Sequence, residues 1–289
     1  MNLRYYIKNP KQLFFRIGRA SFLKGISDEK YIKMLWNSKM SYPLNLNNPK
    51  TFNEKMQWLK LNDRKDIYTS MADKYEVKKL VSDLIGEEYV IPTIGIWDRF
   101  EDIDFDSLPA QFVLKCTHDS GGLFICRDKT KFDIEVARKK IKRSLSQNYY
   151  LSSREWPYKN IKPRVLAEAY MQDGDNPVLN VYKIFNFNGK PEIIQAIQGD
   201  KTRNETIDYF DTEWRILDLK QNYNNSETPL PKPIQLSKML QLAEKLSGGG
   251  IPLFELISMK LKAGFISLST LSIQIRVLQN LSRKIGIVY

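Results

Sequence analysis

The chain has 289 residues, of which 42% are apolar and 27% are charged. A chain of this length and composition can bury a core and form two or three subdomains, which excludes an intrinsically disordered protein. No run reaches the roughly 18 uninterrupted apolar residues of a membrane-spanning helix, and the N-terminus lacks the apolar stretch and cleavage site of a signal peptide. We therefore expect a globular protein of the cytoplasm.

The net charge of +12 is not evenly spread along the chain. No acid precedes Asp28, whereas basic and aromatic residues alternate along residues 1–24. Such a segment suits an anionic membrane surface, so we expect peripheral contact with the inner face of the membrane. The alternative is a solvated basic surface without a specific partner. Because no recognition-helix, zinc-finger or RNP pattern is present, we do not expect nucleic acid as a partner.

Helical patterns dominate the first third of the chain. Residues 1–40 predict helices that are broken at Asn9 and Pro10. Helical periodicity continues over 51–62, where Thr51 and Glu54 have the spacing of a capping box. The clearest amphipathic helix spans 71–85 and is ended by a glycine.

Short strands follow, interrupted by two further helices. Predicted strands cover 89–91, 95–97 and 164–169, and predicted hairpins pair 112–115 with 123–126 and 182–187 with 192–197. The second hairpin turns at Asn188-Gly189, a dipeptide typical of two-residue turns. Helices are predicted over 134–147 and 236–246. Helices that alternate with hairpins indicate an α+β fold with antiparallel sheets.

The loop of the first hairpin, Thr-His-Asp-Ser-Gly-Gly, follows Lys115 at the end of a strand. Small residues let successive backbone N–H groups turn toward an anion, and a lysine adds a point charge. The pattern predicts a flap over a phosphate group, although an ordinary hairpin turn explains the loop as well. It is no Walker loop, because no helix follows. Cys116 and Cys126 flank the loop without metal-site spacing, so we expect buried thiols.

Five segments together resemble one known family. They are KTFNEKMQWLKLNDR, ADKYEVKKLV, GEEYVIPTIGIWDRFEDIDFDSLPAQFVLKCTHDSGG, REWPYKNIKPRVLAEAYM and YKIFNFNGKPEIIQ. Their order and content are similar to the TupA-like ATP-grasp family, which is named for teichuronopeptide biosynthesis and occurs in surface-polysaccharide contexts. The resemblance runs from about Tyr31 to Pro252.

The resemblance implies two α+β subdomains with antiparallel sheets around a nucleotide cleft, and ATP as the cofactor. Most proteins of this fold activate a carboxylate as an acyl phosphate that an amine then captures, so a small acidic or saccharide substrate is expected. We divide the chain accordingly into a basic helical region (1–62), an N-terminal α/β subdomain (63–110), a small subdomain with the flap (111–165), a large subdomain (166–252) and an aberrant tail (253–289).

The resemblance also implies roles for single residues near the phosphates. Lys115 would touch the nucleotide phosphates, and Ser120, Gly121 and Gly122 would form the flap that closes over them. His118, the one histidine of the chain, would hydrogen-bond a phosphate oxygen, or would simply be solvated. Lys74 resembles the upstream lysine of the family, and a solvated helix residue is an equal alternative.

Further roles concern the base, the ribose and the substrate. The stretch Glu168, Ala169, Tyr170 and Met171 matches the hinge whose backbone reads adenine. Asp175 is the candidate for the ribose hydroxyls, unless it only shapes its turn. Lys183 and Arg203 are the candidate catalytic residues that would reach phosphate or an acidic substrate. Val181 stands where family members often carry an acid, which is a departure from the pattern.

The tail departs from the family more seriously. The family expectation is that the last strands supply acidic ligands to Mg²⁺, which bridges the β and γ phosphates. Residues 253–289 contain one acid, Glu255, and five basic residues, so we assign no metal ligand. We expect the last strands to be missing, the tail to form irregular helix, and the chain to be inactive or nearly so.

A frameshift would explain this tail. Synonymous codons can be chosen for residues 253–286 so that a neighbouring frame encodes an aspartate in an apolar strand, a glutamate in the next strand and a Pro-x-Ser-Gly motif, as the family has them. We infer the loss of one nucleotide near the Pro252 codon, in the gene or in its reading.

Two functions of other classes remain open. A glycosyltransferase of the same pathway would use an acidic pair with D-x-D spacing, and Asp104 and Asp106 have that spacing in an acidic loop. A non-catalytic protein would bind membrane or polysaccharide through the basic N-terminus without hydrolysing ATP.

Overall fold

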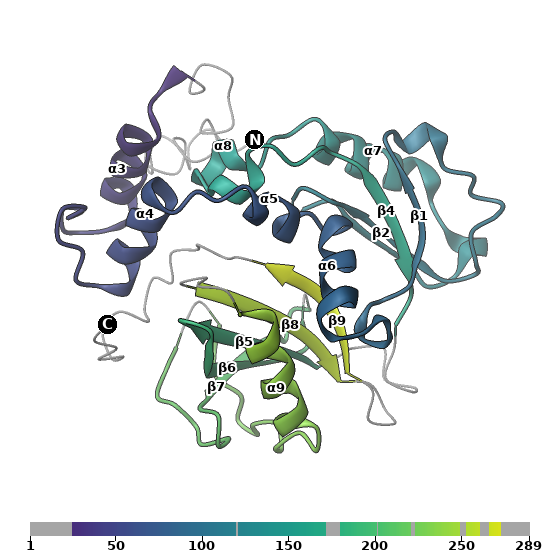
Figure 1. Cartoon of the computed structure of the whole chain (residues 1–289). Coiled ribbons are helices and arrows are strands. Elements are labelled where there is room, and N and C mark those ends of the chain that lie inside the picture. The colour runs from purple at the N-terminus through teal and green to yellow at the C-terminus, as the bar shows by residue number, and fades with distance from the viewer. Residues whose placement is uncertain are drawn as a thin grey trace.

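The computed structural model of the chain describes residues 25–119, 121–171, 180–200, 202–220, 223–248, 253–260 and 266–272, the last two ranges as backbone alone. Its strands are β1 (Thr93–Trp97), β2 (Phe112–Cys116), β3 (Leu123–Cys126), β4 (Val165–Ala169), β5 (Val181–Phe187), β6 (Lys190–Gln198), β7 (Thr206–Phe210), β8 (Leu253–Lys260) and β9 (Ile266–Ser272). They form a four-stranded sheet, β1-β4-β2-β3, and a five-stranded sheet, β7-β6-β5-β8-β9 (Figure 1). All strand pairs are antiparallel, which confirms the expected α+β class.

The helices surround and separate these sheets. They are α3 (Asp28–Lys39), α4 (Phe52–Asn62), α5 (Ile67–Ala72), α6 (Glu76–Ile85), α7 (Ile134–Leu145), α8 (Tyr150–Ser153) and α9 (Leu236–Leu246), with short 3₁₀ turns η2 (Glu87–Tyr89), η3 (Phe100–Asp102), η4 (Lys129–Lys131) and η5 (Trp156–Tyr158). Helix α6 lies between the two sheets (Figure 1). This position lets one helix contact both halves of the molecule.

Local signals set most helix boundaries. The capping box at α4 is confirmed, because Thr51 Oγ1 accepts from Glu54 N at 3.3 Å and Glu54 Oε2 accepts from Thr51 N at 2.9 Å. The predicted continuous helix over 71–85 is wrong at its start. There, Asp73 interrupts the helix by accepting the N–H of Tyr75 at 2.8 Å and of Glu76 at 3.2 Å, so that α5 and α6 are separate.

The small sheet has its core on one face. Phe112, Leu114 and Cys116 of β2 alternate with more exposed neighbours and are fully buried against Ala137 and Ile141 of α7. The predicted hairpin between β2 and β3 is confirmed. Both cysteines are buried free thiols, as expected. The predicted strand at 89–91 is wrong, since residues 87–89 form η2.

The large sheet shares a core with α4, α5, α6 and α9. Its β5–β6 hairpin turns at Asn188 (φ 52°) and Gly189 (φ 84°), which confirms the predicted two-residue turn. Phe52 of α4 packs edge-on against Phe187 at 6.2 Å between ring centroids. These contacts attach the helical region to the large sheet.

Two of the expected domain boundaries differ from the sheet topology. Strand β4 pairs with both β1 and β2, so the boundary expected at residue 165 would separate β4 from its own sheet. Strand β1 likewise lies in the sheet of the flap hairpin, not in a separate N-terminal unit. Hydrogen bonding between strands decides the grouping here, and it places the change of sheet between Ala169 and Val181.

The expectation that the last strands are missing is corrected for part of the tail. Residues 253–260 form β8, which pairs with β5, and residues 266–272 form β9, which pairs with β8. Both runs contain isoleucine together with phenylalanine or threonine, residue types that are enriched in strands. Residues 273–289 lie outside the described residues.

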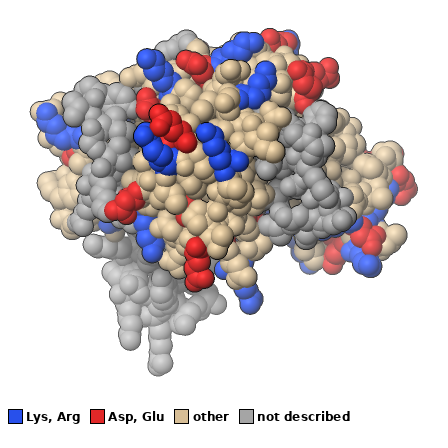
Figure 2. All heavy atoms as spheres, turned by 90° about the horizontal axis from the view of Figure 1, so that it is seen from below, with Lys and Arg blue, Asp and Glu red and all other residues tan. Residues whose placement is uncertain are grey.

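The membrane expectation concerns residues 1–24, which also lie outside the described part of the chain. Among the described helices, none has the length and apolar character needed to cross a membrane. Figure 2 shows one face of the molecule, where Lys and Arg side chains are interspersed with Asp and Glu. The described side chains of this face therefore form no surface of a single charge sign.

Candidate functional site

Two lysines from different elements share one buried glutamate. Glu168 of β4 is 2% exposed. Its Oε1 lies 2.5 Å from Lys78 Nζ of α6, and its Oε2 forms an ion pair with Lys115 of β2. Lys78 Nζ also donates to the carbonyl oxygen of Ile91 at 2.6 Å. The carboxylate thus joins the helix between the sheets to the strand that leads into the flap.

The alternation of β2 and β4 explains why these side chains meet. Directly paired residues of antiparallel strands point to the same face, and Val113 pairs with Glu168 while Lys115 pairs with Leu166. The opposite face carries Phe112 and Leu114, which are buried against α7. Lys115 and Glu168 therefore point away from the small core and toward α6.

The charge states of this cluster follow from burial and pairing. Burial disfavours the charged form of Glu168, but the ion pairs with Lys115 and Lys78 outweigh it and hold the pKa of this carboxyl below its usual value. Burial lowers the pKa of Lys78, and Glu168 partly compensates. Glu168 is thus a carboxylate at neutral pH, and it stabilises two neighbouring ammonium groups.

A third lysine holds the flap from the side of α6. Lys74 Nζ donates to the carbonyl oxygens of Thr117, at 3.4 Å, and of Asp119, and Lys74 N donates to Thr117 O at 3.2 Å. Burial lowers the pKa of Lys74 to about 8, while the charge of Asp119 opposes this shift. Lys74, in the turn between α5 and α6, therefore contacts the flap by its backbone and its side chain together.

The other side of the flap is pinned to α7. Asp119 Oδ1 accepts from Gly122 N at 3.0 Å, and its Oδ2 accepts from the hydroxyl of Ser144. A Cβ atom on Gly122 would lie 2.4 Å from Cys116 Sγ and 2.5 Å from Ser144 Oγ, closer than atoms can approach. Gly122 is therefore required for close packing. Gly121 is exposed, and a Cβ there would meet only Asp119 Oδ2, at 3.5 Å.

His118 is buried, not solvated. Its Nε2 lies 3.1 Å from Ser144 O and 3.0 Å from Gln147 O, both at the C-terminal end of α7. Since both neighbours are carbonyl acceptors, Nε2 carries the proton and donates. Its Nδ1 is buried without a hydrogen-bond partner. His118 thus helps to anchor the flap, and the predicted hydrogen bond to a phosphate oxygen would need a second proton, on Nδ1.

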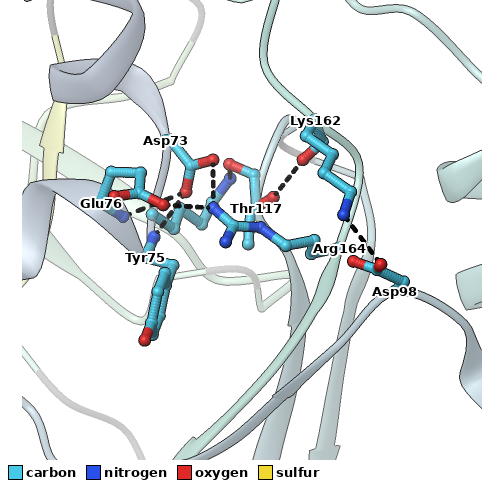
Figure 3. A network of polar contacts seen from close by, with 8 residues as sticks. Asp73, Tyr75, Glu76, Asp98, Thr117, Lys162 and Arg164 are labelled. Atoms are coloured by element: carbon cyan, nitrogen blue, oxygen red, sulfur yellow. Dashed lines mark hydrogen bonds and ion pairs between the residues drawn. The ribbon is translucent and has the colours of Figure 1, made fainter. Parts of the chain in front are cut away.

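Arg164 connects the start of β4 to the start of α6 (Figure 3). Its Nη2 lies 2.7 Å from Glu76 Oε1 and 3.1 Å from Asp73 Oδ2, and its guanidinium stacks 4.9 Å from the ring centroid of Tyr75. The carbonyl oxygen of Arg164 accepts from Thr117 N at 3.0 Å. One residue therefore positions the flap, the start of the helix that carries Lys78 and the turn that carries Lys74.

The matching family model covers residues 54–260, more than half of the chain, and is described as a TupA-like ATP-grasp. The chain belongs to the TupA-like ATP-grasp family. A comparison with the curated proteins finds no match.

Among solved structures, this ATP-grasp chain is similar to a D-alanine–D-alanine ligase from Bacillus anthracis in complex with ATP. The identity is 16% and the TM-score 0.39, over 70% of this chain and 54% of that one. It is also similar to an L-amino acid ligase from Bacillus licheniformis, with 11% identity and a TM-score of 0.43, over 93% of this chain and 56% of that one. The chain thus spans little more than half the length of these two structures.

The structure of this ATP-grasp chain brings together part of the predicted set. Lys115 and Glu168 meet next to α6, Lys74 contacts the flap directly, and the flap residue Gly122 packs on the side of α7. In the hinge, Ala169 N already donates to Pro92 O at 3.0 Å, and Tyr170 Oη accepts from Arg127 Nε at 3.2 Å. Met171 follows at the edge of the described range.

Other predicted residues lie elsewhere or outside the described ranges. Lys183 lies in β5, paired with Gln195 of β6, and Arg203 is exposed in the connection between β6 and β7. No hydrogen bond or ion pair of the described residues joins either one to Lys115. Ser120 and Asp175 lie outside the described residues.

The acidic residues available do not fit a magnesium site. The part of the chain described with side chains contains no group of three or more histidine, cysteine or acidic side chains that would hold a metal ion. The D-x-D pair shapes a turn instead, because Asp104 Oδ1 accepts from Asp106 N at 3.1 Å. We therefore derive no step through Mg²⁺ for this chain.

Sequence reasoning missed three residues of the site, Lys78, Asp119 and Arg164. Lys78 lies in the first half of α6, and its contact with Glu168 joins residues 90 positions apart. The contacts of Asp119 and Arg164 join segments at least 25 residues apart, Ser144 to Asp119 and Asp73 to Arg164. No local pattern reveals such contacts.

Proposed function

We propose that this chain binds ATP at the lysine cluster around Glu168 and serves as an ATP-dependent ligase that activates a carboxylate. The observation that supports this most directly is the arrangement of Lys78 and Lys115, two ammonium groups from α6 and β2 that share one buried carboxylate. A polyphosphate offers such ammonium groups charge-assisted hydrogen bonds, which are among the strongest in proteins. Lys74 adds a third cation next to the flap.

The hinge residues would read the base. Since Ala169 N is occupied by Pro92 O, the backbone groups of Tyr170 and Met171 are the ones that would pair with adenine. Asp175 is proposed for the ribose, and Lys183 and Arg203 for phosphate or the acidic substrate, as the family resemblance implies. The flap residues from His118 to Gly122 would then cover the phosphates.

The proposed reaction has two steps. A carboxylate oxygen of the substrate attacks the γ-phosphorus, ADP leaves, and an acyl phosphate forms. An amine then attacks the acyl carbon, and phosphate leaves with one oxygen that came from the carboxylate. We propose a small acidic or saccharide substrate of surface-polysaccharide biosynthesis, and the cytoplasm as the place of reaction, with the basic N-terminus at the membrane.

We further propose that turnover by this chain is slow. Residues 253–289 hold one acid, and the Mg²⁺ that stabilises the transferred phosphoryl group needs hard anionic oxygens. A lost nucleotide near the Pro252 codon accounts for this composition. Resequencing of the gene around the Pro252 codon tests this proposal. An additional base that restores the neighbouring frame would indicate a sequencing error, and a confirmed loss of the base would indicate a damaged gene.

Nucleotide binding is tested by calorimetry with a non-hydrolysable ATP analogue. We expect Lys115→Met and Lys78→Met each to weaken binding by about tenfold or more, since a hydrogen bond to a charged group contributes roughly 1.5–3 kcal/mol. Lys139→Met, at an exposed position of α7, is the matched control and should bind like the wild type. Equal affinities for all four proteins, or no binding by the wild type, would contradict the proposal.

The ligase chemistry is tested with ¹⁸O in the carboxylate of candidate substrates. Transfer of the label into released phosphate is the result expected for an acyl phosphate, however slow the turnover. A glycosyltransferase would release a nucleotide from a sugar donor and leave the phosphate unlabelled. A protein that binds nucleotide without any label transfer would be a non-catalytic member of the family.

A further inference from the structure

Helix α4 carries a row of buried polar side chains that the nucleotide site does not use. Asn53, Gln57 and Lys60 are 0%, 2% and 2% exposed, and their spacing of four and three residues places them along one face. Both side-chain polar atoms of Asn53 and Nε2 of Gln57 are buried without a hydrogen-bond partner. Lys60 Nζ donates to the carbonyl oxygen of Ser153 at 3.0 Å.

The segment next to this row has unpartnered donors of its own. Ser153 Oγ of α8 and Trp156 Nε1 of η5 are both buried without a partner. The Trp156 ring is flanked by two cations, with Arg64 Cζ at 5.0 Å and Lys159 Nζ at 4.8 Å from its centroid. The Lys60–Ser153 hydrogen bond and the Arg64–Trp156 contact tie α4 and the residues after it to this segment.

Unpartnered buried atoms of this number require an explanation, since folded proteins satisfy most buried polar groups. Of the five unpartnered atoms, four belong to groups that donate: Asn53 Nδ2, Gln57 Nε2, Ser153 Oγ and Trp156 Nε1. A buried glutamine elsewhere shows the usual solution, because Gln195 Nε2 donates to Tyr209 Oη at 2.8 Å. The α4 region therefore has an excess of donors, which fits a ligand rich in acceptors.

The charges around the row favour an anionic ligand. The nearby cations are Lys60, Arg64, Arg154 and Lys159, and the nearby acids are Asp28, Glu54 and Glu155. Glu54 closes the capping box, and Asp28 pairs with Arg64 at 2.7 Å and with Arg154 at 3.4 Å. Four cations against three acids leave this set with an excess of one positive charge.

We propose that the buried polar row of α4, together with Ser153 and Trp156, binds the carboxylate of a small organic acid. The inference deepens the proposed function and rests on it for the role of that acid as the substrate. The position suits this role, because α5 packs against η5 and leads directly into Lys74. A helix of six residues spans about 9 Å, so α5 bridges the distance from the neighbourhood of η5 to the turn that carries Lys74.

Two variants of buried glutamines separate a ligand site from a structural one. Gln57→Met removes an unpartnered donor and keeps the volume, so we expect the free protein to melt about 2–4 °C higher. Gln195→Met removes a donor that has a partner, so we expect a lower melting temperature. The probes are L-glutamate and D-glucuronate, with D-glucose as the neutral control, and binding is measured by calorimetry and thermal shift without nucleotide.

The expected result is that a carboxylate probe binds the wild type and Gln195→Met, and that Gln57→Met and Asn53→Leu weaken this binding at least tenfold. The inference is overturned if neither acid binds the wild type, if glucose binds as well as the acids, or if Gln57→Met melts lower as Gln195→Met does, since buried water would then satisfy the row. Carboxylate binding by a chain that binds no ATP analogue would refute the proposed ligase and leave this site standing.

Discussion

The two hairpins of the molecule have the same architecture and are held in different ways. The β5–β6 hairpin closes with a two-residue turn, in which Asn188 and Gly189 both adopt positive φ values. The β2–β3 hairpin closes with the longer flap, which depends on Lys74 in the turn before α6 and on Ser144 of α7. The conformation of the two-residue turn is set mainly by its own residues, whereas that of the flap depends on other elements.

The comparison shows that buried polar and charged side chains gather around the flap. The two-residue turn receives one hydrogen bond from outside its strands, from Ser247 Oγ to Gly189 O at 2.9 Å. The flap is fixed by a buried aspartate, a buried histidine and a half-buried lysine. Such groups are costly to bury unless they are paired. A loop that requires so many distant polar contacts is a loop whose position matters to the protein.

The largest effect should come from removing the shared carboxylate next to the flap. Glu168→Gln leaves Lys78 and Lys115 together without their counter-charge, and breaking a buried ion pair from one side costs about 3 kcal/mol or more of the free energy of unfolding. Urea denaturation at pH 7 measures it. Because the pKa of Lys78 falls further in this variant, the deficit should shrink at pH 10. A variant as stable as the wild type at pH 7 would show that the lysines do not depend on Glu168.

The next effect tests close packing in the flap. Gly122→Ala forces a methyl group against Cys116 Sγ and Ser144 Oγ, and overpacking of this kind costs about 2 kcal/mol. Gly121→Ala is the matched control one residue earlier, where the space is open, and it should change the free energy of unfolding by less than about 0.5 kcal/mol. Equal effects at both positions would contradict the assigned role of Gly122.

The pH dependence of the free energy of unfolding tests whether Lys74 is held in a buried, polar environment. Its pKa is about 8 in the folded protein, below its usual value of 10.5, so the unfolded chain binds more protons between these values. The free energy of unfolding of the wild type, relative to Lys74→Met, should therefore rise with pH from about 8 to about 10.5, by at most about 1.4 kcal/mol per pH unit. Parallel curves for the two proteins would show that Lys74 titrates normally.

The smallest effect belongs to the local turn. Gly189→Ala places a side chain at φ 84°, where the methyl group has space, since the nearest atom is Ser247 O at 3.7 Å. The cost is the left-handed backbone conformation alone, about 1 kcal/mol. Urea denaturation checks the value, and nucleotide affinity should not change. A cost above that of Gly122→Ala would reverse the comparison between the two hairpins.

The sequence predicts what is periodic and local. The α4 capping box, both hairpins, the Asn188-Gly189 turn and the position of Lys115 at the end of a strand are readable from spacing, because neighbouring residues decide them. The break at Asp73 was not readable, since an aspartate inside an amphipathic pattern caps a new helix only when the chain turns there to meet Thr117.

The candidate site was readable in its strand residues and not in its helix residues. Lys115 and Glu168 follow from the family resemblance, and the structure adds that they form an ion pair. Lys78 and Arg164 join the site through α6, whose approach to β4 depends on the packing of the whole molecule. Tertiary contacts of this kind have no signature in a single sequence.

Helix α6 has one further consequence, because it joins the two sheets by different kinds of contact. Val77 and Val81 pack into the core of the five-stranded sheet, whereas Glu76 and Lys78 reach the four-stranded half through ion pairs. Lys74, in the turn before α6, adds hydrogen bonds to the flap. Movement of the four-stranded sheet away from α6 would replace ion pairs by hydrated charged groups. It would expose little apolar surface. Such opening should have a small heat-capacity change and become easier as ionic strength rises, so that salt, more than temperature, governs how far the two halves separate.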